Sequence, residues 1–312
     1  MQPGNSGTDA AAALAPVLAP DFLRKLDRLH LTVRRSLSTR PGNTPMPRGA
    51  QGSGIEIERH KAYDAGDDLR HLDWNAYGRL DELLIKTFRA EREAPLHIFI
   101  DASASMAVPA DDGKFAFALS LAASLAYVSL RNHDPVRTVG VSAALPRASV
   151  AAPFLRHRSG LHSLRDFLLQ LQPQGETALG TGIAGALVDQ RAPGVAVVLS
   201  DFLMLPDVYE AAFADLLARR FTVAAVRVIG PAERDPTRLF RRGQLIDAET
   251  GRQRFITLTA DNLARYEGAL NAHISHLQAF CNRCGIAFCV ADTGSGLEHC
   301  VFHDLPAAGL VH

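Results

Sequence analysis

The sequence lacks a net charge, because its 33 Lys and Arg residues balance 33 Asp and Glu residues among 312 positions. A balanced chain has no overall field to draw it to nucleic acid or to an anionic membrane. The sequence also lacks a run of apolar residues long enough to cross a bilayer. Its longest uncharged stretch, 115–130, contains three serines and is shorter than the ~20 residues that a spanning helix needs.

Two further features are scarce. No basic residue precedes the alanine-rich patch near the amino terminus, and Pro16 and Pro20 interrupt that patch, which argues against a signal peptide. The chain has only four cysteines. We therefore predict a cytoplasmic protein without an integral membrane segment, whose thiols are reduced.

Composition divides the chain into five parts. We predict disorder over 1–20, a helix and linker over 21–51, a small charged subdomain over 52–95, a large domain over 96–295 and an irregular tail over 296–312. The linker prediction rests on the Pro and Gly content of 39–54. The charged part holds the one tryptophan, Trp74. With Tyr77 it could form a partner-binding surface, but packing in a core or subdomain interface is the favoured interpretation.

Strand and helix patterns alternate from residue 96 onward. The spacing predicts strands at 96–100, 136–143, 194–200, 221–229 and 286–291, a short edge strand at 148–154 and a hairpin turning at 247–251. Helices are predicted at 114–131, 161–171, 178–190, 206–220 and 262–284. Repeated strand–helix units favour an α/β fold, in which helices cover both faces of a mostly parallel sheet.

The stretch 96–106, L-H-I-F-I-D-A-S-A-S-M, carries the clearest chemical signal. An apolar run of this length is typical of a strand buried on both faces, and such strands present polar residues at their carboxyl ends. Here the run leads to Asp101, Ser103 and Ser105. A second apolar run, 194–200, leads to Asp201, and a loop containing Thr177 lies between them. These oxygen donors predict a site for a divalent cation.

D-x-S-x-S, a loop threonine and a strand-end S-D resemble the metal-ion-dependent adhesion site of von Willebrand factor A domains. The resemblance covers about 96–291 and implies a von Willebrand A-like, Rossmann-like sheet, with a small helical and β segment before it. It implies that five residues hold Mg²⁺, or alternatively Mn²⁺ or Ca²⁺: Asp101, Ser103, Ser105, Thr177 and Asp201. A partner's carboxylate would complete the metal's shell. The simpler alternative is that the serines and Asp201 only cap helices and turns.

The charged stretch that precedes this domain resembles the hallmark of the bacterial "domain of unknown function 58" family. The residues that carry the resemblance are Tyr63, Gly66, Asp67, Asp68, Arg70, Asp73, Trp74 and Lys86. The resemblance implies a protein-binding adaptor or chaperone-like role beside a MoxR-type AAA+ ATPase. Many relatives begin with two membrane helices, which are not found here.

The loop departs from the usual Gly-Gly-Thr, because Glu176 replaces the second glycine. A carboxylate there would add a ligand or repel an acidic partner. Glu176, Phe202 and Met106 are the residues that we expect to contact a partner.

Catalysis is the rival interpretation, with Asp101 as the nucleophile of a Mg²⁺-dependent phosphohydrolase. Such an enzyme needs a second carboxylate or base nearby, whereas position 103 is serine, and no Gly-rich phosphate-binding loop is present. We therefore predict no enzymatic activity. The carboxyl-terminal cysteines and histidines could form a zinc site, but core packing explains Cys289, which lies in an apolar run, more simply.

Overall fold

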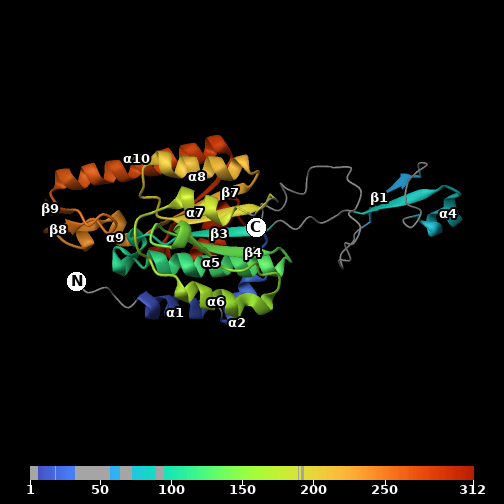
Figure 1. The fold of residues 1–312 in the computed structure, drawn as a ribbon, viewed down its shortest axis with the longest axis horizontal. Helices are drawn as coiled ribbons and strands as arrows, with labels where there is room; N and C mark the ends of the chain where they lie inside the picture. The colour runs from blue at the N-terminus through green and yellow to red at the C-terminus, as the bar shows by residue number, and fades with distance from the viewer. Residues whose placement is uncertain are drawn as a thin grey trace. The chain divides into compact units, whose positions relative to one another are not determined.

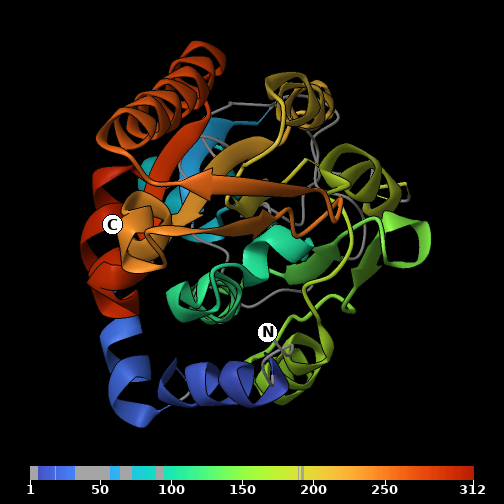
Figure 2. The same cartoon turned by 90° about the vertical axis from the view of Figure 1, so that its left-hand side faces the viewer.

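The computed structural model describes residues 6–17, 19–31, 57–63, 72–88, 95–188, 190 and 193–312. The chain forms two compact units, one comprising residues 1–34 and 94–312 and the other residues 35–93. The first unit contains the predicted α/β domain, which is shown in Figures 1 and 2.

A sheet of six strands forms the centre of the first unit, in the order β10-β7-β6-β3-β4-β5. Every neighbouring pair is parallel except β4 and β5. The strands are β3 (Leu96–Asp101), β4 (Val136–Val141), β5 (Ser149–Ala151), β6 (Val195–Ser200), β7 (Thr222–Ile229) and β10 (Ala287–Asp292). Counted along the chain, this is the doubly wound order 3-2-1-4-5-6 with an antiparallel edge strand. The prediction of an α/β fold with a mostly parallel sheet is confirmed.

Helices cover both faces of this sheet, as Figure 1 shows. One face is covered by α5 (Lys114–Arg131), with α6 (Leu161–Gln170) outside it; the other carries α7 (Leu179–Ala186), α8 (Pro206–Ala218) and α10 (Ala260–Cys284). Nearly every residue of α5 is buried, because the helix lies between the sheet and an outer layer of helices. In the described residues, the segment Ala110–Arg131 alone is long and apolar enough to cross a membrane, and 83% of its apolar window is buried inside the fold.

The prediction of disorder over 1–20 is wrong for the described residues. α1 (Ser6–Val17) packs on α5, with Leu14 and Val17 buried, and the Ser120 hydroxyl donates to the carbonyl oxygen of Ala13 at 3.1 Å. The helix predicted within 21–51 is short, and α2 spans Pro20–Leu26. Residues 32–56, which include the predicted linker, lie outside the described residues.

The carboxyl-terminal residues do not form the irregular tail that the sequence predicts. They contain a 3-10 turn (Thr293–Ser295), α11 (Leu297–His299), a π-helical turn (Cys300–Asp304) and α12 (Leu305–Ala307). Cys300 and Leu305 are buried, and Leu31 pairs with Val311 in an antiparallel bridge. Each turn is too short to show a helical period in the sequence, and burial against the domain stabilises the segment.

The second unit contains an antiparallel pair of strands, β1 (Ile57–Ala62) and β2 (Leu84–Phe88), and helix α4 (Trp74–Leu80). Asp73 caps α4 by accepting from the backbone nitrogens of Asn75 and Ala76 at 3.0 and 3.2 Å. Trp74 and Tyr77 are 67% and 40% exposed, so neither belongs to a core. The structure therefore corrects the expectation of core packing.

A second two-stranded sheet projects from the first unit between β7 and α10. It is the predicted hairpin, formed by β8 (Arg242–Ile246) and β9 (Gln253–Thr257), and its strands are exposed along most of their length. Figure 2 shows the hairpin in orange, crossing the view toward the yellow-green part of the chain.

His97 on β3 should make the stability of the fold depend on pH. Its ring is fully buried and packs edge-on against Phe154 and Phe221, with centroids 5.4 and 5.3 Å away. Burial lowers the pKa of His97 from 6.5 to about 4. Because the folded pKa lies below the unfolded one, the stability contribution is complete above pH 6.5 and is lost as pH falls toward 4.

We expect urea unfolding at pH 7.5 and pH 5.0 to show that the protein loses about 2 kcal/mol more stability over this interval than a His97→Met variant does. Equal losses for the two proteins would show that His97 does not carry this pH dependence.

Candidate metal site at the strand ends

The predicted ligands lie where the strand order of the sheet reverses. β3 and β6 are adjacent and parallel, with Leu96 opposite Val195 and Ile100 opposite Leu199. Asp101 ends β3 and Asp201 follows β6, so both carboxylates reach the same edge of the sheet. Open α/β sheets bind their ligands in the crevice at this point.

The Asp101 carboxylate is fully buried and is surrounded by donors. Its Oδ1 accepts from the backbone nitrogen of Ser103 at 3.0 Å. Its Oδ2 accepts from the Ser200 hydroxyl at 2.6 Å and lies 3.4 Å from the Thr177 hydroxyl. Ser200 Oγ in turn accepts from the backbone nitrogen of Phe202 at 2.9 Å. The fold therefore brings Asp101 and Thr177 together, as the sequence predicts.

Ser103 and Ser105 lie in the turn that follows β3, which continues as a 3-10 helix over Ala104–Ala107. Their hydroxyl oxygens are 3.0 Å apart. Neighbouring oxygens around an octahedral Mg²⁺, each ~2.1 Å from the metal, stand ~3 Å apart. The spacing of the two hydroxyls thus suits adjacent positions in such a shell.

The loop that carries Thr177 is fixed to the ends of β3 and β4 through its backbone. Gly175 O accepts from the nitrogen of Ala104 at 2.9 Å, and Glu176 O accepts from the nitrogen of Ala143 at the same distance. These bonds place Thr177 beside the serine turn.

Gly175 is required in this loop for two reasons. Its φ of +73° lies in the left-handed region, and a Cβ there would approach the Ala144 side chain to 2.7 Å. The next residue, Glu176, is exposed.

Asp201 belongs to a buried ionic network that the sequence does not reveal. Its Oδ2 lies 2.9 Å from the ammonium of Lys114, the first residue of α5. The same ammonium lies 3.0 Å from Glu233 Oε2, and Arg227 lies 3.2 Å from Glu233 Oε1. Asp201 Oδ1 accepts from the backbone nitrogen of Leu203 at 3.2 Å.

Charge counting sets Asp101 apart from this network. Lys114 and Arg227 balance Asp201 and Glu233, whereas Asp101 pairs with no Lys or Arg among the described residues. Burial, with the nearby Asp201 charge, raises the pKa of Asp101 from 3.8 to about 6. One ionised carboxylate therefore lacks a counter-charge.

The residues present fit a divalent cation. In the described part of the chain, no three His, Cys, Asp or Glu side chains gather where they could hold a metal ion, so a metal here would depend on hydroxyl ligands beside the carboxylates. Mg²⁺ prefers such oxygens. Asp101 supplies the uncompensated charge, and the hydroxyls of Ser103, Ser105 and Thr177 supply neutral oxygens.

Two residues predicted to contact a partner are buried. Met106 and Phe202 are both 0% exposed, so their side chains do not form a binding surface, and that expectation is corrected. Phe202 packs against Tyr209 and Phe213, because the chain turns inward after the strand end. Glu176 is the one residue of the three that is exposed.

The signature residues of the charged stretch belong to the second unit. Gly66, Asp67, Asp68 and Arg70 lie outside the described residues, as does the side chain of Lys86. The backbone nitrogen of Tyr63 donates to Leu83 O at 2.9 Å, and Asp73 caps α4. The charged residues of this stretch are also expected to form an ion-pair network, and since most of them lie outside the described residues this stays a prediction.

Sequence reasoning did not identify Ser200, Lys114 or Glu249 as parts of the site. Ser200 belongs to the strand-end S-D pair, so the sequence indicates its place at the end of β6. The sequence does not indicate its hydrogen bond to Asp101. Lys114 and Glu249 reach the site from 87 and 72 residues away in the chain, and no local pattern indicates such contacts.

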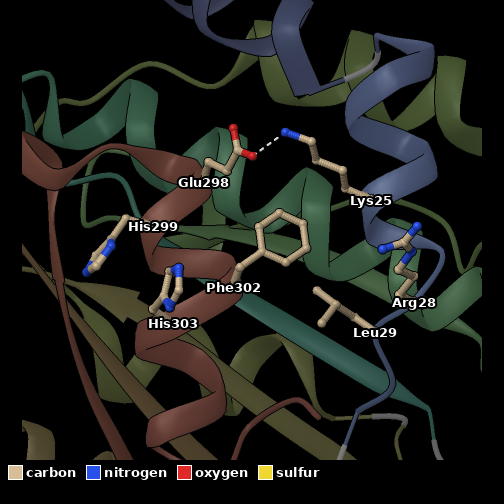
Figure 3. A pocket seen from close by; sticks show the side chains of 7 residues that line it. All are labelled: Lys25, Arg28, Leu29, Glu298, His299, Phe302 and His303. Atoms are coloured by element: carbon tan, nitrogen blue, oxygen red, sulfur yellow. Dashed lines mark hydrogen bonds and ion pairs between the residues drawn. The ribbon is translucent and has the colours of Figure 1, made fainter.

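A cavity of about 540 Å³ lies apart from these residues, between α2 and the carboxyl-terminal helical segment. Figure 3 shows that Lys25 and Glu298 reach toward each other beside it and form an ion pair, with Phe302 between the two elements. None of the predicted ligands lines it.

The four cysteines are free thiols. Cys289 and Cys300 are both buried, and the hydrogen bond between them raises the pKa of Cys300.

Comparison with protein families gives a match over residues 59–291, to the model described as "Protein of unknown function DUF58". Uncharacterized proteins of Mycobacterium tuberculosis and Mycobacterium bovis are each 26% identical over 243 residues, which cover 72% of this chain and 71% of theirs.

Among solved structures, the chain is similar to the conserved hypothetical protein BatB from Bacteroides thetaiotaomicron. The TM-score is 0.37 with 16% identity, over 61% of this chain and 99% of BatB. It is also similar to a von Willebrand factor type A protein from Catenulispora acidiphila, with a TM-score of 0.32 and 17% identity over 47% of this chain and 34% of that one. Likenesses this distant carry no argument about function.

Proposed function

Because the chain belongs to the family described as proteins of unknown function DUF58, we propose a function from its own residues. The protein is a metal-dependent protein-interaction module, without catalytic activity of its own. Its strand-end site binds Mg²⁺, or alternatively Mn²⁺ or Ca²⁺, and a partner's Asp or Glu completes the metal's shell.

One observation carries the proposal: Asp101 is a buried carboxylate without a counter-charge, and hydroxyl groups lie around it. A buried charge is costly unless it is paired. A divalent cation would supply the pairing, and hydroxyl ligands would leave most of the cation's charge available to attract a carboxylate from outside. Capping alone does not account for Thr177, whose hydroxyl faces Asp101 rather than a helix end.

Each residue of the site has a distinct part in this proposal. Asp101 holds the cation by charge, while Ser103 and Ser105 offer neighbouring oxygens at the spacing that an octahedral shell needs. Thr177 would offer a further hydroxyl oxygen. Asp201 would attract the cation by its charge, which the Lys114 ammonium partly offsets.

Positive charge also follows the part of the hairpin that reaches the site. Arg252 is exposed and comes directly after the turn whose Glu249 contacts Thr177. Such charges steer an oppositely charged partner more than they add to its final affinity. A MoxR-type AAA+ ATPase is the partner that we propose to test first, in the cytoplasm, on the resemblance of the signature residues.

Direct metal binding and partner capture test the proposal together. We expect calorimetry to detect Mg²⁺ binding to the purified full chain, and immobilised protein to retain the candidate ATPase in Mg²⁺ but not in EDTA. Asp101→Asn is expected to lower both signals at least tenfold, because it removes the unpaired charge. The matched control is Asp111→Asn, an exposed Asp on the same connection outside the ligand set.

Retention that is equal in Mg²⁺ and EDTA would contradict the proposal. The alternative, a Mg²⁺-dependent phosphohydrolase, requires turnover: hydrolysis of p-nitrophenyl phosphate by the purified chain that disappears in Asp101→Asn would favour it instead.

A further inference from the structure

The tip of the β8–β9 hairpin touches the candidate metal site. Glu249 Oε2 accepts a hydrogen bond from the backbone nitrogen of Thr177 at 3.2 Å, across 72 residues of sequence. Glu249 is half-buried, whereas its neighbours Ala248 and Thr250 are exposed. The Glu249 carboxylate therefore joins the tip of the hairpin to the threonine loop.

The turn is built to present Glu249 in this direction. Asp247 Oδ1 accepts from the backbone nitrogens of Glu249 and Thr250 at 3.0 and 2.8 Å. The nitrogen of Gly251 donates to Asp247 O at 2.9 Å, and Gly251 takes a φ of +69° that favours glycine. Because these bonds fix the turn, the Glu249 side chain is held at the tip without help from the site.

Thr177 connects this carboxylate to the metal ligands. Its hydroxyl lies 3.4 Å from Asp101 Oδ2, while its backbone nitrogen receives Glu249. A carboxylate in this place has the same chemistry as the partner residue that the site is proposed to bind.

We infer that Glu249 is a ligand carried within the chain, which competes with the partner's carboxylate for the metal site. The inference rests on the proposed function. A partner must displace the tip of the hairpin before its own Asp or Glu can bind, so Glu249 sets how tightly an acidic partner is held.

The expected effect follows from population arithmetic. A side chain on the same chain acts at an effective concentration in the ~mM range, which favours the closed hairpin over a free carboxylate. If the tip is open about a tenth of the time, affinity for an external carboxylate falls about tenfold. Removing Glu249 should therefore raise the affinity for an external carboxylate about tenfold.

The competing explanation is that Glu249 only anchors the hairpin. The two roles differ in their effect on ligand affinity, because loss of an anchor loosens the hairpin without making the metal site bind a carboxylate more tightly. A small probe separates them better than a whole protein does, since it does not contact the strands of the hairpin.

The experiment uses the full chain loaded with Mg²⁺ and titrated calorimetrically with N-acetyl-glutamate amide, whose single carboxylate serves as the probe. We expect Glu249→Ala to bind the probe about tenfold more tightly than the unaltered protein and Glu249→Gln to be intermediate. Mg²⁺ binding should be weaker in both variants, because a carboxylate that holds the metal is removed. Glu267→Ala is the control, since Glu267 is exposed on α10.

Probe affinity that is unchanged in Glu249→Ala, with Mg²⁺ still binding, overturns this inference and leaves the proposed function intact. Failure of the unaltered protein to bind Mg²⁺ overturns the proposed function and the inference with it. Circular dichroism of each variant verifies the fold before titration.

Discussion

Replacing Asp101 with Asn is expected to stabilise the metal-free protein by about 1–2 kcal/mol at pH 7.5, although the same change is expected to weaken the proposed metal binding. Asp101 is fully buried, and its pKa is raised from 3.8 to about 6, first by burial and then by the Asp201 charge. Because the folded pKa exceeds the unfolded one, ionisation of Asp101 costs stability as pH rises from 3.8 to 6.

Asparagine removes this cost but also removes an acceptor. The Ser200 hydroxyl donates to Asp101 Oδ2 at 2.6 Å and would face an amide group in the variant. The weaker hydrogen bond offsets part of the gain in stability. Chemical denaturation in EDTA and in Mg²⁺ measures both effects. In Mg²⁺ the order should reverse if the metal binds the unaltered protein well, since a ligand of the folded state stabilises it.

Asp201→Asn provides the matched control, because it alters the equivalent carboxylate on the adjacent strand. Asp201 contacts the Lys114 ammonium at 2.9 Å, so its loss leaves that cation with Glu233 alone. We expect this variant to lose about 2–4 kcal/mol in EDTA. The same sign of change in both Asp variants would show that the division between a paired and an unpaired carboxylate is wrong.

Lys114→Met is expected to give the largest loss of stability, about 3–5 kcal/mol. Lys114 is 1% exposed and contacts both Asp201 and Glu233, which raise its pKa against the opposing effect of burial. Without the ammonium, Arg227 is the one cation among the described residues that still pairs with these two buried carboxylates. A loss of this size is a large fraction of the stability of a typical domain, and urea denaturation measures it.

A double variant separates the charge effect from packing. The double variant Lys114→Met with Asp201→Asn has fewer unpaired buried charges than the Lys114→Met variant. Its loss of unfolding free energy should therefore be less than the sum of the losses in the two single variants. Additive losses would mean that Lys114 stabilises the fold through its methylene groups and not through the ion pairs.

The core of the fold and the strand-end positions of Asp101 and Asp201 could be predicted because they depend on local patterns. The apolar runs before Asp101 and Asp201 indicate buried parallel strands, and the strand ends of such a sheet lie at one edge. The all-round apolar character of α5 likewise predicts a helix that is buried on most sides.

What sequence reasoning could not reach depends on distant partners. A lysine at the start of a helix is normally solvated. Lys114 can be buried because its ammonium pairs with carboxylates such as that of Glu233, which is 119 residues away in the sequence. α1 has an alanine-rich sequence broken by Pro16, and packing against α5 stabilises it more than its own propensity does. The hairpin over 243–259 was predictable, but the direction in which it carries Glu249 was not.

The charge balance of the buried cluster also limits how many anions can reach the site. Asp101, Asp201 and Glu233 are opposed by Lys114 and Arg227, and the buried carboxylate of Asp112 joins them by accepting from the backbone nitrogens of Ala232 and Glu233. Buried acidic side chains therefore outnumber buried basic ones in this cluster. A divalent cation, if bound, would reduce the negative excess. Each carboxylate that then approached, whether Glu249 of the hairpin or an acidic residue of a partner, would increase it again in a low-dielectric setting, which is unfavourable.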